Sequence, residues 1–542
     1  MKKLFSITPD ILGAGKVIFE WNSKGTLLAA CGPKRRIIIL DRSGRSLDEI
    51  VLPPAEWQVD ARTSSCTHLQ WDPAGEFLAI LANGCSTVFI WSSNSQDLLK
   101  IDADFKAQEL TALSWSKNGQ YLAVGTSKGN LLIYNSREKK KTPFMAKHTR
   151  RIVSAVWNKD SILGLCSADR TASWTDGISG HEVKSEMLKG DPMDLCVSDQ
   201  KEDGYARREE NTYTMILNQR VLHLYQLLPE GDRELDLEFQ GQYGNIQRHL
   251  WFGDGYILLG FSAGWIVIVS SHHREVSQEA HSGKYLDILT DVAYSPALGR
   301  IAMGGANTIR IVDTAAGDFS ELKSDAIDLD PNQSVQKLQW TKDGQVLTVS
   351  TQCGNLVSFL ASLPSVTDLY APRMVHLTSL LEMAVTDVQR RIPLCKIELE
   401  VEPAFVGLGP RHVAVGINNQ VWYHRAEKGI NNMISKREYL GSVSCVKLND
   451  GYAAVLSGGG VMLHPIGAAA GDADVVVVAA AAAATTAMTT GAVATSIECI
   501  ALTSHFVITG SKNGILSYYL IPAAAASAAG AAAAAAAAAA TQ

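Results

Sequence analysis

The chain has 542 residues, of which 46% are hydrophobic and 19% charged, with a formal net charge of −6 and a pI of about 6.1. This length exceeds what one compact core requires and suits two or three domains. The acidic balance argues against a protein that holds nucleic acid through bulk positive charge, so no nucleic-acid partner is expected.

An aromatic residue followed by a small polar residue recurs along the chain. Most of these positions are separated by about 42 to 50 residues, which is the period of a propeller blade of the WD-repeat type. The step from Trp157 to Trp251 is about twice as long, so one blade between them lacks the aromatic. The recurring positions are Trp21-Asn22, Trp71-Asp72, Trp115-Ser116, Trp157-Asn158, Trp251, Tyr294-Ser295 and Trp340-Thr341.

Each aromatic ends an alternating apolar run, and a Gly-bearing turn leads into the next run. In the third unit, residues 110–115, 120–125 and 131–135 form three such runs, and a looser fourth follows. Short strands of this kind, joined by tight polar turns, are typical of four-stranded blades. We therefore predict an all-β fold made of tandem WD-repeat β-propellers.

Seven units are counted before residue 330, so residues 1–330 are predicted to form a first, closed, seven-bladed propeller. The fifth unit carries a charged insertion at 199–211. Residues 1–7 are expected to form an edge strand that closes the ring by joining the last blade. The seven units begin near Val17, Thr67, Leu110, Ile152, Met193, Ile246 and Ile288.

The pattern restarts at 335–340, which predicts a second WD-repeat propeller over 331–522 that is partial or open. Further units occur at 405–423, 443–464 and 497–519. Residues 467–496 are expected to be an Ala-rich loop insertion and not a transmembrane helix, because Ala and Thr contribute little to membrane insertion. Residues 523–542 are an Ala-rich low-complexity tail.

The sequence offers no catalytic, cofactor or metal site. Residues 13–17 resemble the end of a phosphate loop but lack its first glycine and its hydroxyl residue. The side chains of His272 and His273 would leave opposite faces of an extended strand, which disfavours a shared metal. Because no catalytic motif is found, we expect no enzymatic activity. The nine cysteines are solitary and no secretory signal precedes them, so we expect reduced structural thiols in the cytosol.

Two sets of residues stand out in the third and fourth units. His148 and Asp169 have the spacing of a hydrogen-bond network inside a WD blade, although that spacing places Thr175, not Trp174, in the Trp position. The second set is a basic cluster between the two units. We interpret the cluster either as a solvated loop or as a patch for an anionic membrane or an acidic partner. Its members are Arg137, Lys139, Lys140, Lys141, Lys147, Arg150 and Arg151.

Several segments, some of them in turns and linkers, resemble the WD repeat-containing protein 19 family, also called intraflagellar transport protein 144. They include Val124–Asn135, Lys147–Ile152, Trp251–Gly255, Leu377–Glu382 and Val401–Pro403. The similarity extends from the first blade to about residue 520, whereas family members continue into a helical repeat region that holds most subunit contacts.

The resemblance implies a non-enzymatic scaffold and cargo-binding subunit of intraflagellar transport complex A. Such a subunit acts in retrograde ciliary transport and in the ciliary entry of membrane proteins. It would be found in the cilium or flagellum, the basal body and the cytoplasm. Its implied partners are the other complex A subunits, tubby-type cargo adaptors and anionic membrane surfaces. A coat-type tandem-propeller subunit of a vesicle coat or another transport complex is the alternative.

Overall fold

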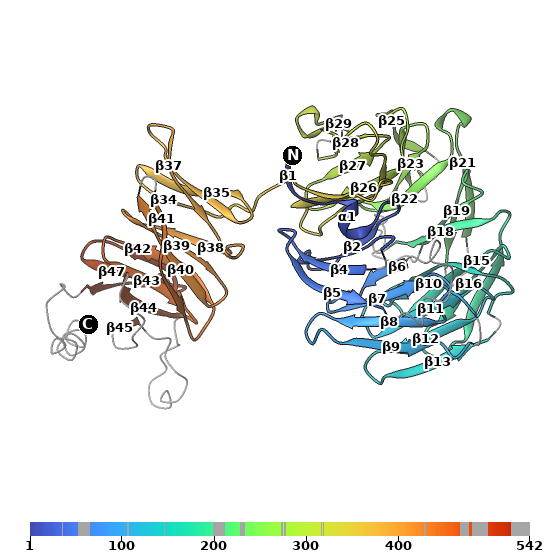
Figure 1. The fold of residues 1–542 in the computed structure, drawn as a ribbon, viewed down its shortest axis with the longest axis horizontal. Helices are drawn as coiled ribbons and strands as arrows, with labels where there is room; N and C mark the ends of the chain where they lie inside the picture. The colour runs from blue at the N-terminus through green and yellow to red at the C-terminus, as the bar shows by residue number, and fades with distance from the viewer. Residues whose placement is uncertain are drawn as a thin grey trace. The chain divides into compact units, whose positions relative to one another are not determined.

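The computed structural model divides the chain into two compact units, Met1–Ser362 and Leu363–Gln542. Both units consist almost entirely of antiparallel sheets (Figure 1), as the all-β prediction required. The structure describes residues 1–521 except 35, 53–65, 106–107, 146, 199–211, 228–232, 273–274, 276–277, 316, 318, 428–429, 467–475 and 480–496. The charged insertion at 199–211 and the tail at 523–542 therefore lie outside the described residues.

The described residues of the first unit form eight sheets, numbered here in chain order as blades 1 to 8. Their first strands begin within about three residues of the predicted starts. Blades 1 to 4 consist of β2 (Ile18–Trp21), β3 (Leu27–Cys31), β4 (Arg36–Asp41) and β5 (Ser46–Val51); β6 (Cys66–Trp71), β7 (Phe77–Ala82), β8 (Thr87–Ser92) and β9 (Leu98–Asp102); β10 (Leu110–Trp115), β11 (Tyr121–Thr126), β12 (Leu131–Asn135) and β13 (Lys140–Phe144); and β14 (Ile152–Trp157), β15 (Ile162–Ser167), β16 (Thr171–Asp176) and β17 (Glu182–Met187).

Blades 5 to 8 complete this unit, which also contains the short helix α1 (Pro9–Leu12). They consist of β18 (Pro192–Val197), β19 (Thr212–Leu217), β20 (Val221–Gln226) and β21 (Arg233–Glu238); β22 (Ile246–Phe252), β23 (Tyr256–Phe261), β24 (Trp265–Ser270) and β25 (Glu279–Lys284); β26 (Asp291–Ser295), β27 (Arg300–Gly304), β28 (Thr308–Asp313), β29 (Ser320–Glu321) and β30 (Ile327–Asp328); and β31 (Val335–Trp340), β32 (Val346–Thr351), β33 (Leu356–Leu360) and β1 (Lys2–Ile7).

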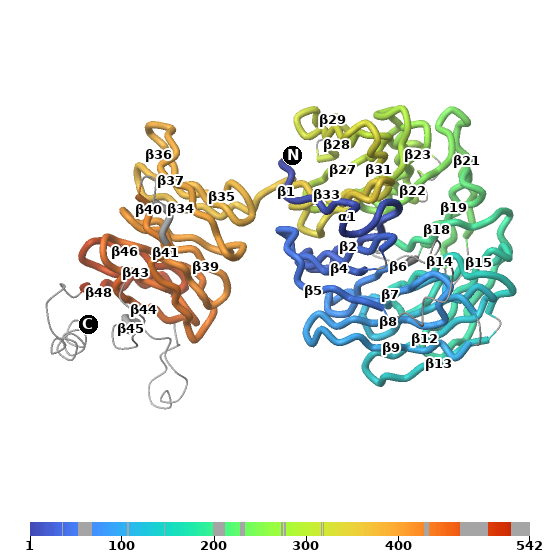
Figure 2. The backbone as a smooth tube through the Cα atoms, viewed as in Figure 1, coloured from blue at the N-terminus to red at the C-terminus, as the bar shows by residue number. Residues whose placement is uncertain are grey.

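The prediction of seven blades ending at residue 330 is wrong, because an eighth sheet belongs to the first unit. Strand β1 pairs antiparallel with β33 from Lys2–Leu360 to Ile7–Leu356, and Figure 2 shows the blue N-terminal strand beside β33. The N-terminal strand does join the last blade, as expected. That blade, however, is formed by residues 335–360, which the sequence pattern assigned to the second propeller.

The recurring aromatic residues connect neighbouring blades. The indole N–H of Trp71 donates to the Glu20 carbonyl at 3.0 Å, and that of Trp157 donates to the Ser114 carbonyl at 2.9 Å. Trp340 reaches the Ala293 carbonyl of blade 7, and Trp21 reaches Thr348 Oγ1 of blade 8 at 2.9 Å. Blade 8 therefore lies between blades 7 and 1.

At several of these positions the polar residue after the aromatic caps the hairpin turn. Asp72 Oδ1 accepts the amides of Glu76 and Phe77 at 2.7 and 2.8 Å, and Asn158 Oδ1 accepts that of Ile162 at 2.7 Å. The turn after Trp71 contains Gly75, whose φ of +70° favours glycine. The aromatic and polar pair thus serves two purposes, one between blades and one within a blade.

The hydrophobic core is divided into clusters between adjacent blades. Ile39 of blade 1 packs in one cluster with Leu78 of blade 2, and Ile311 of blade 7 packs in another with Leu347 of blade 8. All four side chains are fully buried. Each contributes about 1.5–3 kcal/mol relative to exposure, so every blade depends on both neighbours.

The second unit contains four sheets in its described residues, and neighbouring sheets share buried clusters. The units predicted from 405, 443 and 497 are present, whereas the unit predicted from 335 belongs to blade 8. The sheets consist of β34 (Thr367–Tyr370), β35 (Arg373–Ser379), β36 (Glu382–Asp387) and β37 (Ile392–Glu398); β38 (Phe405–Leu408), β39 (His412–Ile417), β40 (Gln420–Glu427) and β41 (Ile430–Glu438); β42 (Val443–Leu448), β43 (Tyr452–Ser457), β44 (Gly460–Pro465) and β45 (Val476–Ala479); and β46 (Ile497–Leu502), β47 (Phe506–Ser511) and β48 (Leu516–Leu520).

Part of the Ala-rich segment 467–496 is a strand, which corrects its prediction as a loop insertion. Residues 476–479 form β45, the fourth strand of a sheet, and pair with β44. This stretch contains three consecutive valines, which favour strands because their branched side chains suit a pleated sheet. The remainder of 467–496 lies outside the described residues.

Candidate functional site

His148 and Asp169 are brought together at one end of blade 4. His148 Nδ1 lies 2.8 Å from Thr171 Oγ1, and Nε2 lies 2.9 Å from Ser173 Oγ. Asp169 accepts hydrogen bonds from the amides of Thr149 and Thr171 at 2.7 and 3.0 Å, and from both hydroxyls. The network ties the segment before β14 to the turn between β15 and β16.

The surroundings of the two groups shift their pKa values. Burial lowers the pKa of His148, although the charge of Asp169 opposes this shift. Burial alone would raise the pKa of Asp169, but the hydrogen bonds from Thr171 and Thr149 outweigh it and lower that pKa to about 2. A neutral imidazole beside a carboxylate is therefore the stable arrangement at neutral pH.

Ser173, His148 and Asp169 are residue types found in hydrolytic triads, but their placement disfavours that chemistry. Ser173 is 1% exposed and His148 4% exposed, so no substrate carbonyl can approach the serine oxygen. The imidazole also contacts Thr171 in place of a direct short bond to Asp169, from which it lies 3.7 Å. The arrangement suits a structural network better than a proton relay.

Trp174 is not part of this network. Neighbouring residues of a strand point to opposite faces, so the indole lies away from Ser173 and packs between blades 4 and 5. Its ring stacks on Tyr225 with centroids 4.0 Å apart, and its Nε1 has no hydrogen-bond partner among the described residues. Thr175, on the same face as Ser173, has a buried Oγ1 that likewise lacks a described partner. The network therefore ends at Ser173.

The seven basic residues do not form one patch, because strand β13 separates them. Residues 137 and 139 lie in the turn before β13, and Lys140 and Lys141 begin that strand. Lys147, Arg150 and Arg151 lie beyond its other end, where the His148 amide bonds to the Gly129 carbonyl. The rest of the strand, residues 142–144, separates the two groups by roughly 10 Å.

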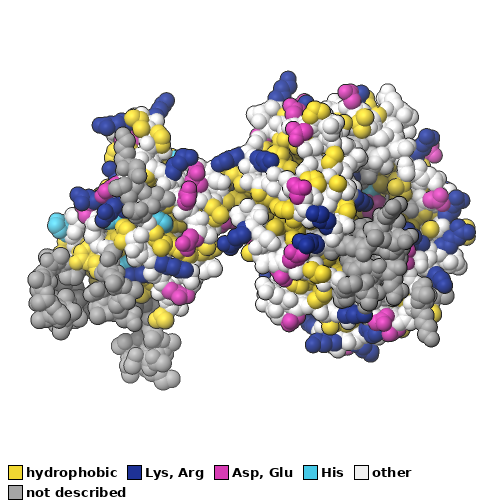
Figure 3. All heavy atoms as spheres, viewed as in Figure 1, with side chains coloured by type: hydrophobic (Ala, Val, Ile, Leu, Met, Phe, Trp, Pro, Cys, Tyr) yellow, Lys and Arg dark blue, Asp and Glu magenta, His cyan; other side chains and the backbone are white. Residues whose placement is uncertain are grey.

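Two of these cations already have partners within the propeller. Lys141 forms an ion pair of 2.6 Å with Asp104 of the segment after blade 2, and Lys147 donates to the Gly180 carbonyl at 2.8 Å. Figure 3 shows Lys and Arg side chains mixed with Asp and Glu over the visible face. The local arrangement thus favours two small basic groups over one broad basic surface.

The sequence reasoning missed a set of charged residues on the first strands of the blades. Glu20 Oε2 accepts the Trp71 amide at 3.2 Å, and Lys337 Nζ donates to the Phe19 carbonyl at 2.8 Å. Glu20 also lines an inner cavity of about 290 Å³ formed by blades 1 to 4. The sequence does contain a signal, because Glu20 stands directly before Trp21 in an otherwise apolar run. The alternation of apolar and polar residues does not show, however, that the face carrying Glu20 lines a cavity.

We expect Glu20→Gln to stabilise the protein at pH 8 and to have little effect at pH 4. Removal from water raises the pKa of Glu20 to about 7, despite the opposing charge of Lys337. Below pH 4.5 the group is protonated in both folded and unfolded chains, whereas above pH 7 the folded state alone holds a poorly solvated charge. The expected gain at pH 8 is about 1–3 kcal/mol in the free energy of unfolding.

Thermal unfolding of both proteins across this pH range would measure the effect. Glu76→Gln, at an exposed position, is the matched control and should change little at either pH. A Glu20→Gln protein that is less stable than the wild type at pH 8 would contradict the assignment of a charge penalty to Glu20.

No helix in the described part of the chain has the length and apolar character needed to span a bilayer. The eight cysteines whose side chains are described are free thiols. The finding on membrane-spanning helices concerns the described residues, which exclude most of 475–494.

Repeated four-stranded blades, indole bonds between blades and the His148 network together define a tandem WD-repeat propeller protein. A family model described as WDR19 first beta-propeller matches residues 17–354, and one described as WDR19 second beta-propeller matches residues 374–527. The chain belongs to the WD repeat-containing protein 19 family. The interval between the two matches contains the boundary between the two units, at residues 362 and 363.

Individual relatives agree with this assignment. WD repeat-containing protein 19 of Mus musculus is 36% identical over 526 residues, and the human protein of that name is 34% identical over 525 residues. The protein dyf-2 of Caenorhabditis elegans is 27% identical over 536 residues, or 94% of this chain and 36% of dyf-2. Each alignment with the mouse and human proteins covers 96% of this chain, which spans 37% of their length.

The similarity of this chain to solved structures concerns the fold alone. The C-terminal WD40 domain of Sif2 has a TM-score of 0.51 and 11% identity, covering 67% of this chain and 98% of that domain. A computationally designed protein, Ika8, also has a TM-score of 0.51, with 17% identity. At such identities only the propeller architecture is shared.

Proposed function

We propose that this chain is the propeller part of a non-enzymatic scaffold subunit of intraflagellar transport complex A. In this role it would act in retrograde ciliary transport and in the ciliary entry of membrane proteins, in the cilium, the basal body and the cytoplasm. The observation that carries the proposal is the order and extent of the two family matches, 17–354 and 374–527. They follow the chain through both propellers and leave only residues 355–373 between them unmatched.

The physical character of the surface supports a scaffold. A propeller offers two faces and a rim built from short turns, and its strands are held on both sides by neighbouring blades. His148 of blade 4 is 4% exposed, and its two ring nitrogens lie within hydrogen-bond distance of Thr171 and Ser173 of the same blade. Binding of several subunits or cargo adaptors, tubby-type adaptors among them, needs such an exposed and rigid platform and no reacting group.

A chimaera tests this function. We expect that mouse WD repeat-containing protein 19, with its matching N-terminal 37% replaced by this chain, restores normal cilium length in cells lacking the mouse protein. Affinity purification of the chimaera should recover the other complex A subunits. The reason is that blade geometry and turn sequences, matched over 96% of the chain, determine the surfaces that partners contact.

The control chimaera carries an unrelated propeller, the Sif2 WD40 domain, at the same position. It should express but fail to restore cilia, because it shares the fold and not the surface. Recovery of vesicle-coat subunits in place of complex A would support the coat-type alternative. A folded chimaera that recovers neither set would contradict both.

A further inference from the structure

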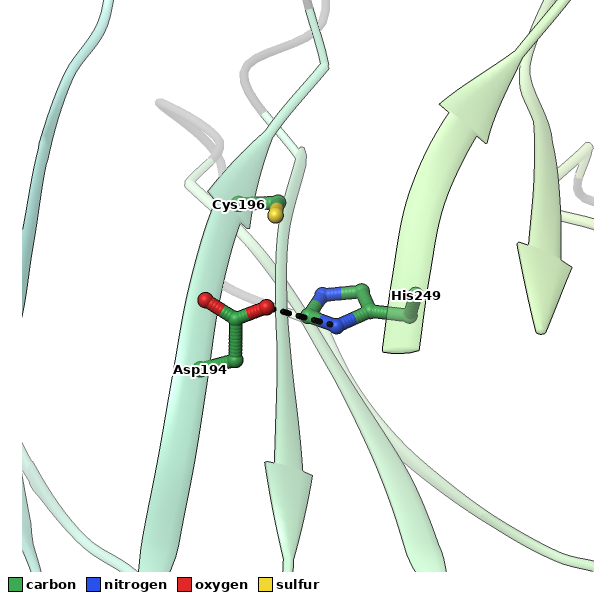
Figure 4. Close-up of side chains that lie close together, drawn as sticks. All are labelled: Asp194, Cys196 and His249. Atoms are coloured by element: carbon green, nitrogen blue, oxygen red, sulfur yellow. Dashed lines mark ion pairs between the residues drawn. The ribbon is translucent and has the colours of Figure 1, made fainter. Parts of the chain in front are cut away.

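A buried histidine faces a carboxylate and a thiol between blades 5 and 6 (Figure 4). Asp194 and Cys196 are two residues apart in β18, so their side chains leave the same face of the strand, and His249 comes from β22. A carboxylate oxygen, the Cys196 sulfur and a His249 ring nitrogen all lie within 4.8 Å of one another. Asp194 Oδ2 is 3.5 Å from His249 Nδ1.

The hydrogen bonds of His249 fix the direction of its lone pair. Nε2 lies 3.1 Å from the Thr214 hydroxyl and 3.3 Å from the Thr214 carbonyl oxygen. A carbonyl oxygen can only accept, so Nε2 carries the proton and Nδ1 of the neutral ring presents its lone pair to Asp194. Nδ1 is buried and has no hydrogen-bond partner in the described residues, while His249 as a whole is 1% exposed.

A lone pair that faces a carboxylate at this distance is repelled by it, and a cation bound between the two groups would remove that repulsion. Arg248, the residue before His249, lies 3.9 Å from Asp291 and also interacts electrostatically with Asp194 and Cys196. The other Asp194 oxygen, Oδ1, accepts the Leu195 amide at 3.1 Å and is held in place. The cluster thus offers one oxygen, one nitrogen and one sulfur as ligand atoms.

From this arrangement we infer that Asp194, Cys196 and His249 form a binding site for a divalent transition metal of the Zn²⁺ type. Zinc binds this set of nitrogen, oxygen and sulfur ligands, and water completes a site with three protein ligands. In tetrahedral zinc sites the ligand atoms lie about 3.3–3.7 Å apart. The Asp194–His249 pair already has this separation, and Cys196 needs a shift of at most about 1.3 Å.

The second shell and the chemistry of binding agree with this inference. A ligating histidine usually donates its other ring N–H to a carbonyl or carboxylate, as His249 does to Thr214. Because the thiolate and not the thiol is the metal ligand, binding converts the Cys196 thiol to a metal-bound thiolate and releases one proton to solvent. The site links the first strands of two adjacent blades, and it is independent of the proposed transport function.

Titration of the purified, metal-free 542-residue chain with Zn²⁺ tests the site. We expect binding of one ion, an increase in the melting temperature and release of a proton, measured by calorimetry in buffers of different ionisation enthalpy. Co²⁺ in place of Zn²⁺ should give a thiolate-to-metal charge-transfer absorption. Cys196→Ser and Asp194→Asn should each weaken Zn²⁺ binding by roughly 100-fold or more, and Cys196→Ser should abolish that absorption.

Cys353→Ser, at an exposed thiol elsewhere in the first unit, and His281→Gln are the matched controls and should bind as the wild type does. The circular dichroism of each metal-free variant establishes that it is folded. Equal binding by wild type and Cys196→Ser, or no binding by a folded wild type, would overturn the inference. The second outcome would mean that His249 holds a proton, not a metal, against Asp194.

Discussion

A fragment of residues 1–362 should fold by itself and unfold in one cooperative transition, whereas a fragment of residues 1–330 should not. The shorter fragment lacks β31, β32 and β33. It leaves β1 without the strand that it pairs with and deprives Trp21 of its bond to Thr348. It also exposes the apolar surface of blade 7 that packs on blade 8, including Ile309 and Ile311. Open sheet edges and exposed cluster residues both favour aggregation.

Limited proteolysis of the full chain would show the same boundary. The stable product should end near residue 362 and not near 330, since residues 335–360 are held in blade 8. The control is the 1–362 fragment without residues 2–7. It keeps blades 1 to 7 and the other three strands of blade 8 and loses only β1. We expect it to melt at a markedly lower temperature. A stable, monomeric 1–330 fragment would show that blade 8 is dispensable.

Replacing Asp169 with Ala should destabilise the first propeller by about 2–4 kcal/mol. The change removes the acceptor of two amides and two hydroxyls, and it leaves His148 without its nearby negative charge. Because a folded-state pKa of about 2 lies below the ordinary value of 3.8, the wild-type carboxylate stabilises the fold above pH 4. This contribution is lost as the pH falls from about 4 to 2.

Chemical denaturation at pH 7 and at pH 3 would measure both effects. The difference between wild type and variant should be largest at pH 7 and smaller at pH 3. Asp176→Ala is the matched control, because Asp176 caps an exposed turn of the same blade through the amides of Ile178 and Ser179. It should cost about 1 kcal/mol or less. Equal losses for the two variants would argue against a special role for the Asp169 network.

Local sequence determined the blades themselves. An aromatic ending one strand, a capping residue such as Asp72 and a turn glycine such as Gly75 are short-range signals, so most blades could be found from their own residues. The sheet β34–β37 was not predicted. The spacing of His148 and Asp169 also lies within one blade and could be read in the same way, including the opposite orientation of Trp174. The WD-repeat fold class followed from these local patterns, whereas the family resemblance rested on particular segments, some of them in turns and linkers.

Tertiary structure decided which blades share a ring. The pairing of β1 with β33 joins the two ends of the first unit, and no periodic pattern indicates which distant strand an edge strand will choose. The candidate metal site could not be predicted from the sequence for the same reason, because Asp194 and Cys196 come from one blade and His249 from the next. The basic residues were adjacent in sequence but were separated by an extended strand. Sequence proximity and spatial proximity agree within a blade and differ between blades, since only the packing of neighbouring sheets brings distant strands together.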